Sequence, residues 1–173
     1  MSFRLFGTRI TISFALAALL CAAALLPGKL PPLLLAAILL HEGGHLLYIA
    51  AERLRLTEIR LSLTGVRMTL ADNVTMTFQR QLMLNCSGPV ANLLTAAVTT
   101  LLDGGVQGER LTAVSLAVAA VTLFPLGNSD GAAVLMALLE RYGGRLGRAA
   151  VWIRIGCSLF AAAVLLALCG AFG

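Results

Sequence analysis

The two histidines of the chain both lie in the pentapeptide His41-Glu42-Gly43-Gly44-His45. On a helix, side chains four residues apart lie on one face, so both imidazoles can bind a single metal ion. Glu42 can accept a proton from a metal-bound water and then donate it to a leaving amine. Zinc suits this chemistry because it lowers the pKa of its bound water to about 7. The spacing therefore predicts zinc at His41 and His45, with Glu42 as the catalytic base.

The pentapeptide lies inside an apolar run, Leu30–Ala51. An ionisable residue within a membrane span is energetically expensive, and it is by default a candidate for function. Three such residues within five positions favour a functional site over a chance occurrence of the motif.

A catalytic zinc usually takes three protein ligands, and the chain has no third histidine. Asp130 is favoured because it follows an apolar span directly, in a Gly-Asn-Ser-Asp-Gly turn. Its alternative role is to cap a helix over Ala132–Arg141. The four cysteines show no metal-binding spacing. The other carboxylates that we weighed are Glu52, Glu58, Asp72, Asp103, Glu109 and Glu140.

The composition indicates a membrane protein. Apolar residues make up 59% of the chain and charged residues only 12%, whereas soluble domains carry roughly 25% charged residues. We expect one all-α polytopic domain over residues 1–173, without an appended soluble module. The net charge of +5 does not indicate nucleic-acid binding, because the arginines form no basic stripe with interleaved aromatic residues.

Five or six transmembrane helices are expected, each spanning about 20 residues. The first, Ile10–Leu26, begins like a secretory signal but is long for one, and we interpret it as a retained span. The further predicted helices are Leu30–Ala51, Leu82–Leu102, Leu111–Leu126, a short helix Ala132–Arg141, and Ala150–Phe172.

Between the second and third spans, polar and apolar residues alternate on both sides of Thr64-Gly65. This period of two predicts a small β-hairpin over Ile59–Leu70. The alternative is an irregular loop at the membrane interface.

The arginines are concentrated before the first span, in the hairpin loop and around Arg141–Arg148. Because positive charge marks the cytoplasmic side, this distribution predicts a cytoplasmic N-terminus and hairpin. We therefore expect a multi-pass integral protein of a bacterial cell membrane.

Three ordered motifs between Leu39 and Gly131 resemble the site-2 protease family of intramembrane zinc metalloproteases. The first is the HExxH helix. The second, Gly88-Pro89-x-x-Asn92, is similar to the family's Gly-Pro-x-x-Asn element. The third, which ends in Asp130-Gly131, is similar to its Asn-x-x-Pro-x-x-x-x-Asp-Gly element. The small size and lack of a PDZ-like insertion resemble the compact subgroup that includes a sporulation protease maturing a sigma-factor precursor.

The resemblance implies that Asp130 is the third zinc ligand and that Asn92 lies near the catalytic centre, contacting substrate or the oxyanion. It also implies that an unwound substrate adds as a strand to the hairpin. Thr122 departs from the family, which has asparagine there, so a single hydroxyl replaces an amide. Asn128 can compensate for this loss. The expected substrate-binding residues are thus Asn92, Gly88, Pro89, Thr122 and Asn128.

The function that these residues predict is zinc-dependent hydrolysis of peptide bonds in transmembrane or membrane-associated protein substrates, beside or within the lipid bilayer. Two alternatives remain. One is an inactive relative that acts as a membrane binding partner, and the other is a zinc carrier or sensor. Transport usually needs polar residues along a path, whereas here they gather at one depth.

Overall fold

The structure is a computed structural model, and it describes most of the chain between residues 30 and 142. The described residues are 2–5, 8–14, 30–62, 65–71, 76–102, 105–125, 129–142, 152 and 155–157. Most of the predicted spans Ile10–Leu26 and Ala150–Phe172 lie outside the described residues, as does Asn128.

A four-stranded sheet has the order β1-β2-β3-β4. Strands β3 (Leu56–Ser62) and β4 (Gly65–Leu70) form an antiparallel pair, which confirms the predicted hairpin. β1 (Ser2–Leu5) and β2 (Thr8–Ile12) form a second antiparallel pair, and β2 runs parallel to β3.

The two N-terminal strands correct the prediction of an all-α fold with one hairpin. Residues 10–12 belong to β2 and do not begin a helix. The segment Thr8–Ile12 is rich in β-branched residues, which favour a strand. Its apolar residues continue without a break into the following apolar run, and this continuity concealed the end of the strand.

Helix α2 (Leu30–Ala51) carries the HExxH pentapeptide. Pro31 and Pro32 occupy its first turn, where the missing N–H groups have no helical partner to lose. The helix ends at Ala51, and Arg53, two residues further on, has a left-handed φ of 52°. Leu54 N–H then bonds to Ile49 O at 2.9 Å, and Arg53 N–H to Ala50 O at 3.1 Å. This pair of bonds is a Schellman cap, and it turns the chain from α2 into β3.

Three further helices follow the hairpin. α3 spans Phe78–Leu101, α4 spans Gly105–Leu123 and α5 spans Asp130–Tyr142. They correspond to the predicted helices over Leu82–Leu102, Leu111–Leu126 and Ala132–Arg141, with boundaries shifted by one to six residues. Caps account for part of the shift: Thr77 accepts a bond from Arg80 N–H, and Ser129 accepts one from Ala132 N–H.

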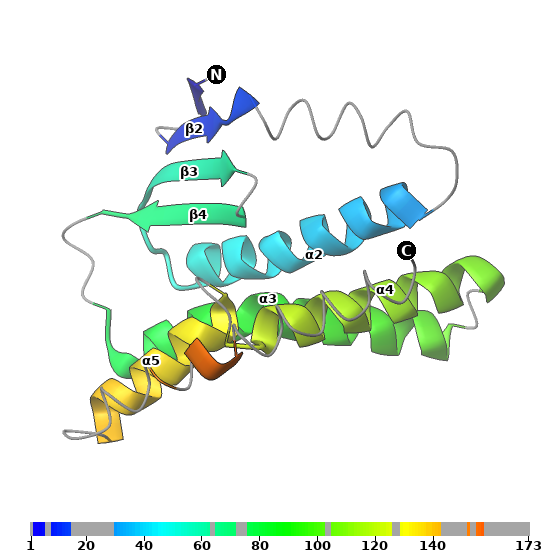
Figure 1. Ribbon diagram of the computed structural model, residues 1–173. Coiled ribbons are helices and arrows are strands. Elements are labelled where there is room, and N and C mark those ends of the chain that lie inside the picture. Colours follow the sequence, from blue (N-terminus) through cyan, green and yellow to red (C-terminus); the bar gives the residue numbers. More distant parts are fainter. Residues whose placement is uncertain are drawn as a thin grey trace.

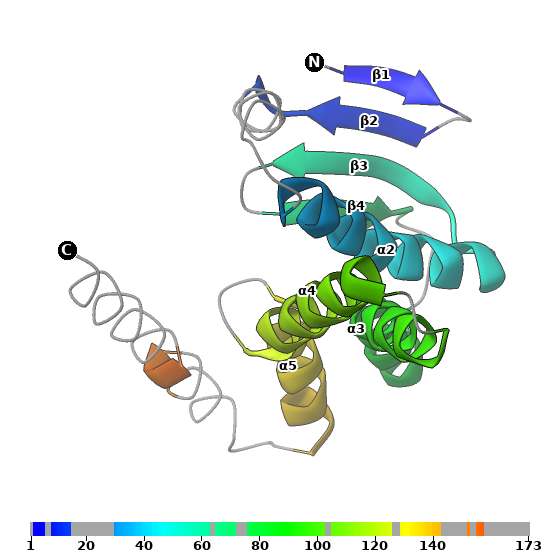
Figure 2. The same ribbon diagram turned by 90° about the vertical axis from the view of Figure 1, so that its right-hand side faces the viewer.

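Helix α2 lies between the sheet and the other three helices (Figure 1). The view turned by 90° shows the same arrangement, with β4 nearest to α2 and β1 farthest from it (Figure 2). The sheet therefore projects away from the helices, whereas α3, α4 and α5 pack on the far side of α2.

Small residues form the contacts between the helices. The buried apolar side chains are mainly alanines, including Ala96 of α3 and Ala119 of α4. Thr99 and Thr112 join these two helices by a hydrogen bond of 2.6 Å between their hydroxyl groups. Small residues and hydroxyl bonds are typical of helix contacts in membranes, where backbones approach closely.

Helices α2 and α3 are long and apolar enough to cross a membrane, and only 22% of each apolar window is buried. Their outer surfaces expose large apolar side chains, such as Leu47 at 72% and Leu94 at 60%. The core helix of a soluble protein would bury such residues, so both helices indicate a membrane protein. The predicted number of five or six spans is not tested, since much of the two terminal spans lies outside the described residues.

Candidate metal centre

His41 and His45 lie one turn apart on the buried face of α2, with exposed fractions of 5% and 8%. Their rings meet edge to face, with centroids 4.9 Å apart. The two Nε2 atoms are 3.3 Å from each other, so they point to one place. A helix alone produces this arrangement, because a separation of four residues brings two side chains to one face.

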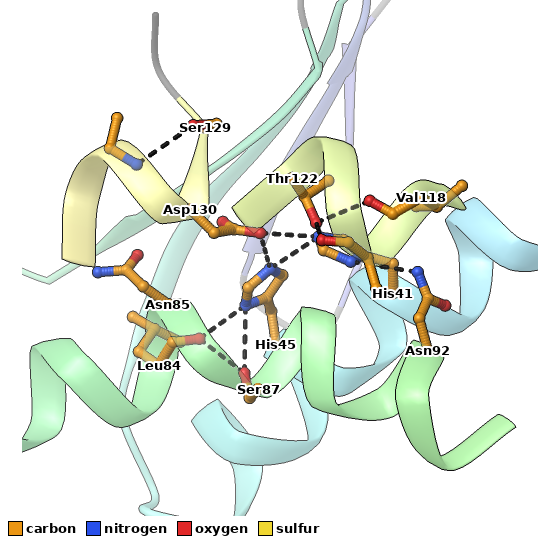
Figure 3. A network of polar contacts seen from close by, with 12 residues as sticks. His41, His45, Leu84, Asn85, Ser87, Asn92, Val118, Thr122, Ser129 and Asp130 are labelled. Carbon is orange, nitrogen blue, oxygen red and sulfur yellow. Dashed lines mark hydrogen bonds and ion pairs between the residues drawn. The ribbon is translucent and has the colours of Figure 1, made fainter. Parts of the chain in front are cut away.

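Asp130 approaches the same place from the first turn of α5 (Figure 3). Its Oδ2 lies 2.9 Å from His41 Nε2 and 3.5 Å from His45 Nε2. In the part of the chain that the structure describes, these three residues form a group that could hold a metal ion. The structure thus joins Asp130 to the two histidines, although 85 residues separate it from His45 in the sequence.

The donor set fits zinc. Ligand atoms about 2.0–2.2 Å from a tetrahedral zinc lie roughly 3.4 Å from one another. The three separations here, 2.9, 3.3 and 3.5 Å, bracket that value. Two imidazoles and one carboxylate are also a typical catalytic zinc set, which leaves the fourth position open.

Gly88 of α3 makes room beside the two imidazoles. A Cβ at this position would collide with His45 Nε2 and would lie 2.7 Å from His41 Nε2. Gly88 is followed by Pro89, inside the helix, and both residues are buried. The Gly-Pro element therefore faces the donor atoms, and any side chain in place of Gly88 would take the space that a metal ion needs.

Gly131 allows a close helix contact beside Asp130, the third donor residue. A Cβ at this position would overlap the backbone of Leu123, the last residue of α4. The start of α5 thus lies directly against the end of α4. Ser129 fixes the turn by donating a hydrogen bond to Phe124 O at 2.6 Å and accepting one from Ala132 N–H. Together these contacts set the position of Asp130.

The far side of the His45 ring is held by α3. Its Nδ1 lies 2.8 Å from Leu84 O and 3.1 Å from Ser87 Oγ. Ser87 Oγ in turn donates to Leu84 O at 2.7 Å. Because a carbonyl only accepts, Nδ1 must carry the proton, and the lone pair of His45 is then on Nε2. The sequence offered no signal for Ser87 or for the Leu84 carbonyl.

Asn92 lies behind the other imidazole and is fully buried. Its Nδ2 is 3.5 Å from His41 Nδ1, and its Oδ1 has no hydrogen-bond partner among the described residues. Exchanging the two ends of the amide would place Oδ1 against Nδ1–H, and the two ends have nearly the same shape. His41 Nδ1–H would then donate to Oδ1, and the lone pair of His41 would be on Nε2.

The other predicted site residues are placed as follows. Glu42 is half-buried, and no hydrogen bond or ion pair joins it to another described residue. Thr122 lies close to His41 in Figure 3, but its hydroxyl donates within α4, to Val118 O and Ala119 O. Two of the alternative carboxylates are paired elsewhere, Glu52 with Arg80 at 3.3 Å and Glu58 with Arg60 at 3.2 Å.

No protein-family model matches the chain, and no curated protein matches it by sequence. Its fold is similar to that of the site-2 protease from Methanocaldococcus jannaschii, with a TM-score of 0.65. The similarity covers 96% of this chain and 83% of the other, at 18% sequence identity. The chain therefore shares the fold of that protein, and its His41, His45 and Asp130 form a group that could hold a metal ion.

Proposed function

We propose that the protein is a zinc metalloendopeptidase of the site-2 protease type. It cleaves transmembrane or membrane-associated protein substrates within or beside the membrane. One observation carries this proposal: two imidazoles and a carboxylate converge in a buried group on an apolar helix, next to Glu42. The shared fold supports the class of protein, and the donor set supports the metal.

His41, His45 and Asp130 would hold the zinc. When bound there, zinc would supply Lewis-acid chemistry, which would polarise the scissile carbonyl and lower the pKa of a bound water to near neutral. Glu42 adjoins His41 in the sequence, and it forms no hydrogen bond or ion pair with another described residue. It therefore accepts the proton that the attacking water loses and delivers it to the nitrogen of the leaving amine.

The two imidazoles need their lone pairs on Nε2 to bind the metal, and α3 supplies a partner for each Nδ1. Leu84 O and Ser87 hold His45, and Asn92 would hold His41 through its amide oxygen once the two ends of the amide are exchanged. Such partners fix the tautomer and the ring orientation of ligating histidines. Asn92 would thus orient His41 as a metal ligand. Because Asn92 is completely buried, it would not contact an extended substrate.

Substrate binding is assigned to the hairpin and to the residues that close the site. An unwound substrate segment would pair with an edge of the β-sheet, where main-chain hydrogen bonds recognise the backbone. Gly88 and Pro89 shape the inner wall, with Thr122 and Asn128 near the aspartate in the sequence. The distribution of arginines supports a multi-pass protein of a bacterial cell membrane with the N-terminus and sheet in the cytoplasm.

One observation favours a second candidate. The hydroxyl of Thr122 is bonded within its own helix, so it offers a substrate less than the amide of an asparagine would. This favours an inactive relative that binds membrane proteins without cleaving them.

The experiment is co-expression of the protein with candidate membrane substrates, comparing the wild type with Glu42→Gln and His45→Ala. The protease predicts cleavage by the wild type only, full zinc content in Glu42→Gln, and loss of zinc in His45→Ala. A zinc-loaded wild type that binds these substrates and leaves them intact would favour the inactive relative. Cleavage by Glu42→Gln at the wild-type rate would reject Glu42 as the base.

A further inference from the structure

Four exposed arginines lie in two directly opposed pairs on the β-sheet. Arg4 of β1 is opposite Arg9 of β2, and Arg60 of β3 is opposite Arg67 of β4. Residues that are directly opposite in neighbouring strands project from the same face of a sheet. Each pair therefore brings two guanidinium groups to one face.

Both pairs are on the same face. Arg9 and Thr11 are two residues apart on β2, so their side chains project to one side. Thr11 is directly opposite Arg60 in the parallel β2–β3 pairing. The four arginines thus form a continuous group across the sheet, which we call the arginine face: Arg4, Arg9, Arg60 and Arg67.

Few negatively charged side chains balance the positive charge of the arginine face. Glu58, opposite Arg9, is the one carboxylate among the described strand residues. Its Oε1 already accepts bonds from Arg60 at 3.2 Å and Thr11 at 3.3 Å. Within the described ranges, Arg4, Arg9 and Arg67 form no ion pair. Like charges directly opposite each other destabilise a sheet, so an anionic ligand would relieve this repulsion.

The connections of the sheet place this face at a membrane surface. The β3–β4 hairpin joins the end of α2, Ala51, to the start of α3, Phe78, and both helices are long enough to cross a membrane. The links on either side of the hairpin are short, so the sheet lies near the level of the lipid headgroups. Figure 2 shows the sheet projecting away from α3, α4 and α5, and the side chains of all four arginines are exposed among the described residues.

An open hollow of about 380 Å³ lies on the arginine face, lined by Arg4, Arg9, Thr57 and Glu58. Two of its lining residues are the opposed arginines that have no ion pair among the described residues. The planar fork of an arginine donates two parallel hydrogen bonds to a phosphate group. The hollow therefore offers donors from two strands to one phosphate.

We propose that the arginine face binds the phosphate headgroups of anionic phospholipids and so holds the sheet against the membrane surface. Lipid is favoured over an acidic protein segment because the connections of the sheet already place it at headgroup level. Basic groups beside a membrane span attract anionic lipids in this way. The proposal rests on the membrane location of the chain and is independent of its proteolytic activity.

The experiment is native mass spectrometry of the purified full-length protein in mixed micelles with equal amounts of phosphatidylglycerol and phosphatidylcholine. The wild type is expected to retain phosphatidylglycerol in preference to phosphatidylcholine. Arg4→Gln/Arg9→Gln is expected to lower that preference about fivefold or more. The matched control, Arg53→Gln/Arg55→Gln, removes the same charge from the adjoining loop and is expected to keep the preference.

A second variant, Arg60→Gln/Arg67→Gln, should lose the preference as well, and it keeps the test decisive if the first variant folds poorly. Zinc content and thermal unfolding report whether each variant is folded. An unchanged preference in both arginine-face variants, or an equal loss in the control, would overturn the proposal. So would a wild type that shows no lipid preference but binds a fluorescent hexaglutamate peptide through Arg4 and Arg9, since that would assign the face to an acidic protein segment.

Discussion

The contact between α2 and α3 leaves no space for an added methyl group at two glycines, whereas the sheet carries long charged side chains that touch little. Gly44 lies against Ser87 and Ala91, and Gly88 lies against both imidazoles. In the sheet, main-chain bonds provide the connection between strands, and side chains such as Arg9 stay exposed. We infer that the narrow space between α2 and α3 determines where the metal-binding atoms of the histidines lie, whereas the sheet functions through the charge of its arginines. Substitutions should therefore act in different ways in the two regions.

The largest effect is expected at Gly88. Replacing it by alanine places a methyl group in collision with His45 Nε2. Zinc affinity should fall by at least about 100-fold, as for the loss of a ligand or its support. The helix itself should gain stability, since alanine favours a helix by about 1 kcal/mol over glycine. Competition with a chromophoric chelator measures the affinity.

Gly43→Ala is the matched control for Gly88→Ala. A Cβ at Gly43 meets nothing within 4 Å, although Gly43 is adjacent to Gly44 and only two residues from His41 and His45. Its zinc affinity should remain within about twofold of the wild type, within the scatter usual for surface substitutions. Equal affinity in Gly88→Ala and Gly43→Ala would show that volume at Gly88 does not control the donors.

Asn92 should give the next largest effect. Asn92→Leu removes the acceptor for His41 Nδ1–H, so zinc affinity should fall about 10- to 100-fold. Asn92→Asp keeps an acceptor of the same size and should retain most of the affinity. Because both variants alter a fully buried position, a loss of similar size in the two would indicate a packing role and not orientation of His41.

Gly44→Ala tests the helix contact without touching the donors. Its Cβ would collide with Ser87 O and lie 2.7 Å from Ala91 Cβ, so α2 and α3 must move apart. Overpacking of this kind destabilises a protein by about 1–3 kcal/mol. Thermal unfolding in detergent should show the loss relative to Gly43→Ala. A midpoint equal to that of Gly43→Ala would mean that this helix contact is not tight.

The smallest effect on stability is expected at the ion pair between Arg80, near the start of α3, and Glu52, just after the end of α2. Arg80→Gln breaks the pair with Glu52, whose side chain is 38% exposed. Exposed pairs stabilise proteins by about 0–1 kcal/mol, so the unfolding midpoint should barely change. A shift as large as that of Gly44→Ala would contradict the contrast between volume and charge.

The sequence predicted the elements whose pattern is local. The apolar run around His41 and His45 indicated α2, and alternation around Thr64-Gly65 indicated the β3–β4 hairpin. It did not predict β1 and β2, because β2 pairs with β3 across almost 50 positions and β1 joins the sheet only through β2. Their few apolar residues also resemble the beginning of a membrane span.

The same distinction between local patterns and long-range contacts applies to the candidate site. Motif spacing selected His41 and His45, while the position after an apolar span and the family resemblance selected Asp130; the structure brings the three together. The resemblance placed Asn92 near the catalytic centre, but its contact with His41 and that of Leu84 O with His45 could not be predicted, because both depend on how α3 is rotated against α2. That rotation is set by Gly44 and Gly88, whose fit appears only once the two helices are packed.

The central claim, that His41, His45 and Asp130 together hold zinc, is tested most directly by X-ray absorption at the zinc edge of the purified protein. The account predicts one zinc per chain with two imidazole nitrogens and a carboxylate oxygen, and a loss of that oxygen ligand together with weaker binding in Asp130→Ala. A protein purified without zinc, or an absorption spectrum that Asp130→Ala leaves unchanged, would contradict it.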